Sequence, residues 1–154
     1  MPGAMYSGGR SGITAAAGTD NWTIDANAAG EVGRIAEFHW GGESTATTAM
    51  RTRLVRPTTA GVTPTVGTDG VRHPGSQAAR LRFITAWTTQ PVLPADGVAE
   101  LFVTSWNSHG GVVLWKASPG EEIVIINGLL TSSVSCRAVL GVGVSSYGAL
   151  WDEI

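Results

Sequence analysis

The sequence contains one cysteine, Cys136, and few charges, because Asp, Glu, Lys and Arg together make up only 14% of its 154 residues. A single cysteine cannot form an internal disulfide, so folding does not depend on an oxidising compartment. A chain of this length buries roughly 70% of the surface that it exposes when unfolded, which is enough for one stable domain. The scarcity of charge indicates a largely neutral surface, as in a subunit that covers part of its outside in an assembly.

Targeting and membrane signals are also missing. Residues 1–20 lack the basic start and apolar core of a secretory signal, and no apolar run is long enough to span a bilayer. We therefore expect synthesis and folding in a cytosol and no membrane partner. The net charge of −2 gives no general attraction to nucleic acid. Nine of the ten basic residues are arginines, the cation that protein interfaces favour, which indicates a protein partner.

Short β-like runs separated by turn residues fill most of the chain. No window shows the apolar spacing of an amphipathic helix. The runs that we predict as strands are 21–27, 31–40, 49–56, 80–87, 98–106, 111–116, 121–127 and 134–144. The sequence therefore predicts an all-β fold, an antiparallel β-sandwich of about eight strands, jelly-roll-like in type. Residues 1–20 show no apolar period and are predicted to be an extended N-terminal arm, with residues 21–154 as a single β-sandwich domain.

The stretch RIAEFHWGG raises the question of an active site. Strict alternation places Phe38 and Trp40 on one face together with Arg34. Glu37 and His39 then share the opposite face, where they could exchange a proton or hold a metal ion. The other two histidines have no helical or strand-neighbour spacing, and the cupin pattern of two histidines followed by glutamate is absent. We therefore interpret the pair as polar residues on the outside of a strand, with a cupin-type metal enzyme left as a third possibility.

Other catalytic patterns are missing as well. No G-x-S-x-G elbow occurs, and Cys136 lies on the apolar face of a predicted strand, where a thiol is usually inert. The carboxylate pairs at 121–122 and 152–153 are adjacent in sequence, so on strands they would point to opposite faces. The glycine clusters lack the spacing of a phosphate-binding loop. We therefore expect no enzyme activity, no catalytic residues, no metal and no cofactor.

Candidate contact residues for a partner come from the arm, a basic strand and a long connection. The strand 49–56 carries arginines that could meet an acidic patch or simply face solvent. Residues 57–79 hold three prolines and four glycines, and a connection of this length is usually functional or disordered. The predicted contact residues are Tyr6, Arg10, Arg51, Arg53, Arg56, His73 and Trp151. The six tryptophans are expected to pack in the core or in a subunit interface, with sugar binding as the alternative.

Three segments carry a resemblance to a known class of proteins. They are SGITAAAGTDNWTIDA (11–26), RIAEFHWGGESTATTAMRTRLVRPTTAGVTPT (34–65) and LPADGVAELFVTSWNSHGGVVLWKASPGEEIVIING (93–128). The matching positions are Trp22, Ile24, Glu37, Gly41, Gly42, Arg56, Gly61, Pro64 and Trp115. On these residues the chain resembles the small decoration, or cement, proteins of tailed-bacteriophage capsids.

The resemblance implies a virion structural protein on the capsid exterior. It would be a homotrimer whose partner is the major capsid protein, and it would stabilise the contacts between major capsid subunits. Its motifs are structural turns and strand faces, without a catalytic signature. The alternative is a carbohydrate-binding β-sandwich module of a phage tail or a cell-surface assembly, which would need two or three exposed tryptophans on one face.

Overall fold

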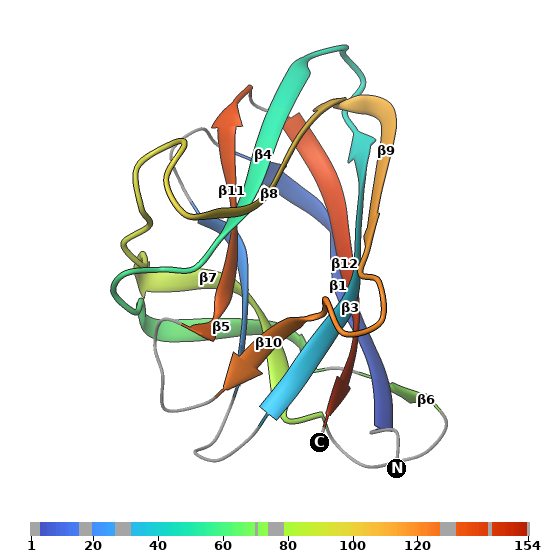
Figure 1. Cartoon of the computed structure of the whole chain (residues 1–154). Coiled ribbons are helices and arrows are strands. Elements are labelled where there is room, and N and C mark those ends of the chain that lie inside the picture. Colours follow the sequence, from blue (N-terminus) through green and yellow to red (C-terminus); the bar gives the residue numbers. More distant parts are fainter. Residues whose placement is uncertain are drawn as a thin grey trace.

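The structure, a computed structural model, describes residues 4–15, 20–26, 32–69, 71–73, 79–126, 132–141 and 143–153. These residues form two antiparallel sheets packed face to face (Figure 1). The prediction of an all-β antiparallel sandwich is therefore confirmed. None of the described residues belongs to a helix that could cross a membrane.

Each sheet contains six strands. The first has the order β10-β3-β12-β1-β6, with β9 also paired to β3, and the second has the order β5-β7-β2-β11-β4-β8. We call them sheet A and sheet B. The strands of sheet A are β1 (Ala4–Ala15), β3 (Val32–Glu43), β6 (Val71–His73), β9 (His109–Lys116), β10 (Ile123–Ile126) and β12 (Gly143–Glu153). Those of sheet B are β2 (Asp20–Ala26), β4 (Ala49–Val55), β5 (Val62–Asp69), β7 (Leu81–Thr89), β8 (Glu100–Asn107) and β11 (Val134–Leu140).

Most consecutive strands lie in different sheets, as in β1 to β2, β3 to β4, β8 to β9 and β11 to β12. The chain thus crosses repeatedly between the two layers, as it does in jelly-roll sandwiches. The strand total exceeds the predicted eight. One reason is that the predicted run 134–144 is two strands, β11 and the start of β12, which belong to opposite sheets.

The predicted N-terminal arm is an integral strand where the structure describes it. Residues Ala4–Ala15 form β1, which lies inside sheet A between β12 and β6. Its side chain Tyr6 is buried opposite Trp151. The segment is extended, as expected, but it belongs to the sandwich. The Gly and Ser residues of β1 show no apolar period in the sequence. Strand β12 supplies the apolar partners of this pairing.

The predicted long connection 57–79 also contains strands. Residues Val62–Asp69 form β5 at the edge of sheet B, and Val71–His73 form β6 at the edge of sheet A. Pro64 lies in β5, an edge position that tolerates a residue without a backbone N–H. The expectation of one long functional or disordered connection is wrong for these ranges, because Val62–Asp69 pair with β7 and Val71–His73 pair with β1.

Aromatic rings fill the space between the sheets. Trp22 of β2 lies at the centre, with its ring centroid 5.3 Å from Phe38 and 5.1 Å from Phe83. Four of the six tryptophans are buried, namely Trp22, Trp40, Trp106 and Trp151. Cys136 is fully buried in the same core, as its position on an apolar strand face predicted.

Strand β3 changes face at a β-bulge. Two consecutive residues of β12 pair with Glu37 and Ile35, so Ala36 is an extra residue in β3. Ile35 is therefore buried in the core on the same side as Phe38. Strict alternation, which put Arg34 on the face of Phe38, is wrong for this half of the strand. The bulge leaves Arg34 pointing outward.

Candidate interaction surfaces

Glu37 and His39 lie side by side on the outer face of sheet A, as their spacing predicted. Their closest charged atoms, Glu37 Oε1 and His39 Nδ1, are 3.9 Å apart, and His39 is mostly exposed. No group of three or more His, Cys, Asp and Glu side chains suited to a metal ion occurs among the described residues. The imidazole lies against Gly148 of the neighbouring strand, where any larger residue would collide with it. The pair is therefore a weak surface contact in this structure.

Two predicted contact residues pack against each other inside the molecule. Tyr6 and Trp151 are stacked, with ring centroids 6.3 Å apart and an interplanar angle of 12°. Both side chains are buried, and the Trp151 indole N–H donates to Glu153 at 3.0 Å. Neither can touch a partner in this structure, which corrects their assignment as contact residues. They face inward because β1 and β12 are paired in the middle of sheet A.

A third predicted contact residue, Arg53, is also buried. Its side chain has no exposed surface, although Arg53 faces away from the core of the sandwich. The segment around Asp96 folds over it, and the guanidinium donates to the carbonyls of Pro94 and Ala95. Salt bridges join it to Asp96 at 3.0 Å and to Glu100 at 3.4 Å. Arg53 therefore joins two segments within the molecule, and its assignment as a partner-contact residue is wrong in this structure.

The remaining predicted contact residues differ in exposure. Arg51 is exposed on sheet B, and Arg10 is exposed while donating to Thr85 Oγ1 at 2.8 Å. Arg56 is partly buried and donates to the carbonyls of Ser132 and Val124, and this burial lowers its pKa. The backbone of His73 pairs with Met5 in β6, and its side chain lies outside what the structure describes. Of the three arginines, Arg51 is the side chain most available to a partner.

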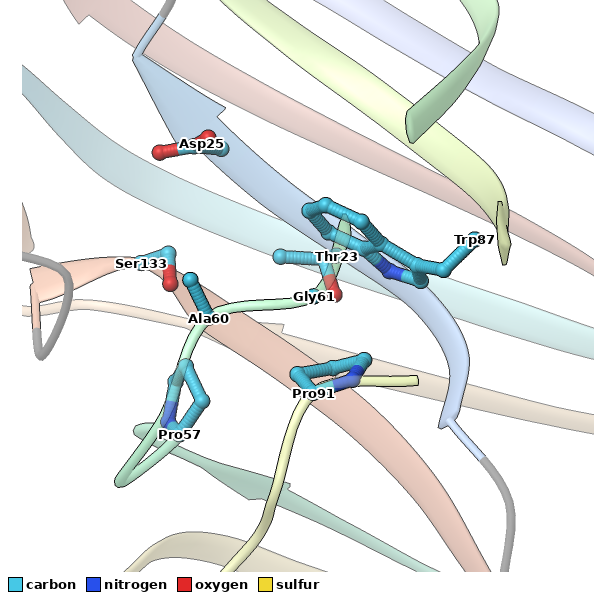
Figure 2. A pocket seen from close by; sticks show the side chains of 8 residues that line it. All are labelled: Thr23, Asp25, Pro57, Ala60, Gly61, Trp87, Pro91 and Ser133. Carbon is cyan, nitrogen blue, oxygen red and sulfur yellow. The ribbon is translucent and has the colours of Figure 1, made fainter. Parts of the chain in front are cut away.

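A small pocket lies on the outer face of sheet B, beneath the segment that follows β4 (Figure 2). It is lined by Thr23, Asp25, Pro57, Ala60, Gly61, Trp87, Pro91 and Ser133. The backbone at Gly61 packs directly on the Trp87 ring, so that a side chain there would collide with the indole. The enclosed part holds about one water molecule. The Trp87 ring therefore packs against the segment 57–61. The pocket that remains has no room for a sugar ring.

The two most exposed large aliphatic side chains of the described residues lie on β9, and β8 carries two more exposed ones. On β9, Val112 is 80% exposed and Leu114 is 59% exposed. On β8, Leu101 and Val103 are also exposed. We call this surface the β8–β9 side and define it as Leu101, Phe102, Val103, Val112, Leu114 and Trp115. The sequence analysis missed it, although both strands carry apolar residues at successive positions, a pattern that leaves some of them on the outer face.

The two aromatic residues of the β8–β9 side extend the core to the surface. Phe102 and Trp115 are half-buried, and their ring centroids are 6.4 Å apart. Phe102 also meets the buried Trp40, and Trp115 meets the buried Phe38. The half-buried rings of Phe102 and Trp115 thus continue the core toward the surface at the edge strands β8 and β9.

Comparisons with protein-family models, with curated proteins and with solved structures find no match for this chain.

Proposed function

We propose that this protein is a virion structural protein, a capsid decoration protein that binds the outside of a phage head as a homotrimer. The observation that supports this most is the β8–β9 side, where exposed aliphatic side chains such as Val112 and Leu114 lie next to half-buried aromatic rings. Surfaces of this kind mark protein interaction sites. The low charge of the chain supports an attachment role in the same way.

The physical mechanism is the addition of weak contacts. Once one subunit of a trimer binds the shell, the remaining contacts become intramolecular and act at a high effective concentration. A ring of three subunits can therefore join neighbouring major capsid subunits through patches that are individually weak. No bond is made or broken, so no catalytic or metal-binding group is needed.

A second surface suits the contact with the shell. Arg51 is exposed on sheet B, and the exposed Leu140 pairs with it across the strands. A guanidinium beside an aliphatic side chain can bind a carboxylate on a partner while burying apolar area. We propose this part of sheet B as the face toward the major capsid protein.

The carbohydrate-binding alternative needs several exposed tryptophans on one face. Four tryptophans are buried, and the other two, Trp87 and Trp115, are half-buried and belong to different sheets. This arrangement supports the capsid proposal over the alternative. A glycan array probed with the purified chain provides the corresponding test, and we expect no binding.

The decisive experiment mixes the purified protein with empty heads of the phage whose genome encodes it. We expect co-sedimentation with the heads, saturation at a multiple of three chains, and a higher temperature of head disruption. Tail preparations of the same phage serve as the control and should not bind. Failure to bind heads, or binding to glycans alone, would overturn the proposal.

A further inference from the structure

We infer that the bond between Asp96 and Gly97 is a site of spontaneous isoaspartate formation, and that Arg53 and Glu100 suppress this modification in the folded protein. The inference does not depend on the proposed function. It rests on the contacts that hold the Asp96 side chain and the Gly97 backbone nitrogen in their turn.

The chemistry of the site follows from the Asp-Gly sequence. Glycine has no side chain beside the attacking nitrogen, so the reaction meets little steric resistance there. The Gly97 nitrogen bonds to Cγ of Asp96, and one carboxylate oxygen leaves as water with the amide proton and a proton from solvent. Water then adds to the resulting succinimide and breaks its bond between the Gly97 nitrogen and the former α-carbonyl carbon. The product is isoaspartate, in which the main chain continues through the Asp96 side chain.

The Asp-Gly pair is accessible to water. Both residues are exposed, and the Asp96 side chain keeps 49% of its surface. Gly97 has a positive φ of 81°, and a hydrogen bond of 3.1 Å from Val98 N to Ala95 O closes the turn around the pair. An exposed turn offers the space for a five-membered ring and the water that the reaction exchanges. Burial therefore does not protect this bond, and any protection comes from specific contacts.

The two reacting groups are held by different partners. Asp96 Oδ1 lies 3.0 Å from Arg53 Nη2 in a salt bridge. The Gly97 N–H instead donates to Glu100 Oε1 at 2.9 Å. Ring closure requires the Asp96 carboxylate carbon to meet the Gly97 nitrogen, so these contacts have to break before the new bond forms. Hydrogen bonds that involve charged groups are stronger than neutral ones, which makes this rearrangement costly.

The two partners are themselves fixed. The Arg53 guanidinium has no exposed surface and donates to two backbone carbonyls of the same segment. Arg53 Nη1 also lies 3.4 Å from Glu100 Oε1, the atom that accepts the Gly97 N–H. Arg53 and Glu100 thus form one connected network with the reacting pair. The reaction has to wait for a local opening of this network.

Isomerisation would in turn disturb the covering of Arg53. The Asp96 Cβ would enter the main chain, and the remaining carboxylate would be the former α-carboxyl group at a different place. The salt bridge would lose its geometry, and a buried guanidinium without its partner is destabilising. The network therefore protects the contacts on which it is built.

The first test measures isoaspartate at position 96 by peptide mapping of wild-type chains aged in neutral buffer, both folded and in urea. The sequence contains one other Asp-Gly pair, at 69–70, and valine follows both pairs. In urea, where no contact holds either pair, we expect similar rates at the two positions. In the folded protein we expect position 96 to react about tenfold or more slowly than in urea.

Two substitutions of Glu100 test the network itself. Glu100→Ala removes the acceptor of the Gly97 N–H, and we expect isoaspartate at position 96 to form about tenfold faster than in the folded wild type. Glu100→Gln keeps an acceptor oxygen and should be the slower of the two variants. Near-ultraviolet circular dichroism checks that both are folded, and the comparison of folded with unfolded wild type needs neither variant.

Three results would overturn the inference. One is the same rate at position 96 in folded and in unfolded wild-type chains. Another is a folded Glu100→Ala chain that forms isoaspartate there no faster than the wild type. The third is an absence of isoaspartate at position 96 in urea while it accumulates at position 69.

Discussion

Arg53 and Asp96 form a salt bridge of 3.0 Å in which the guanidinium is fully buried while the carboxylate is half exposed. Arg53 lies on the outer face of sheet B, which is normally open to water. The turn at residues 94–98, closed by a hydrogen bond from Val98 N to Ala95 O, covers it. Arg53 thereby ties this turn to the sheet, while Val92 earlier in the same segment pairs with the backbone of Thr59.

Replacing this arginine should be costly. Arg53→Met removes the guanidinium that donates to two carbonyls and pairs with two carboxylates, so we expect a loss of about 2–4 kcal/mol in the free energy of unfolding. Arg51→Met is the matched control, because Arg51 is exposed on the same strand, and its effect should stay within about 0.5 kcal/mol. Urea denaturation measures both. Equal effects of the two changes would contradict the buried tie.

Glu153 joins the end of β12 to the start of β7. Its buried carboxylate accepts the backbone N–H groups of Arg80 and Leu81, both at 2.8 Å, and the indole N–H of Trp151 at 3.0 Å. Glu153→Gln removes the negative charge that strengthens these hydrogen bonds and replaces Oε2, which also accepts the Arg80 N–H at 2.9 Å, by an NH₂ group, so we expect a loss of about 1–3 kcal/mol. Glu121→Gln in an exposed turn should leave the melting temperature unchanged. An unchanged melting temperature in Glu153→Gln would show that the cluster does not stabilise the fold.

The two glycines before the β3–β4 connection differ in what surrounds them. A Cβ at Gly42 would collide with the backbone of Ser108, whose carbonyl accepts Ser44 N–H at 2.9 Å, whereas a Cβ at Gly41 meets nothing closer than 3.5 Å. We expect Gly42→Ala to cost about 1–3 kcal/mol and Gly41→Ala to be neutral. Thermal denaturation of the two variants measures the difference. Equal tolerance of both would mean that the connection moves freely.

Tyr147 lies in the core, and its hydroxyl makes no hydrogen bond of normal geometry within the described part of the chain. Tyr147→Phe should therefore change the free energy of unfolding at neutral pH by less than about 1 kcal/mol. Burial is the main cause that raises the pKa of Tyr147, and the Cys136 thiol raises it further, while Ser145 and Asn21 oppose the shift.

The pKa shift of Tyr147 predicts a pH dependence. Above about pH 10 the tyrosine ionises in the unfolded chain and stays protonated in the folded one. The wild-type protein should therefore lose up to about 1.4 kcal/mol of stability per pH unit as the pH rises beyond that point. Tyr147→Phe should lose stability less steeply, which urea titrations between pH 9 and 11 measure. Identical slopes would show that the phenol ionises freely in the folded state.

The sequence alone was sufficient for the fold class, because side-chain alternation is a local property of strands. The alternation of β11 placed Cys136 in the core, and the spacing of Glu37 and His39 placed both on one outer face. The turn at 118–121 is local in the same way, because Pro119 and Gly120 favour a tight reversal, and Glu121 N–H donates to the Ser118 carbonyl at 2.9 Å. The capsid role and the trimer stay predictions.

The tertiary structure decided the features that side-chain alternation within a single strand cannot predict, namely strand register and side-chain burial. The extra residue Ala36 reverses the faces of β3 because β12, more than a hundred residues away, sets the register. Arg53 and Arg51 have equivalent positions in sequence, and only a distant turn buries the first. The Gly-rich start of the chain became β1 because β12 supplied its partners. Side-chain burial and strand register depend on segments remote in sequence, so the local pattern alone could not reveal them.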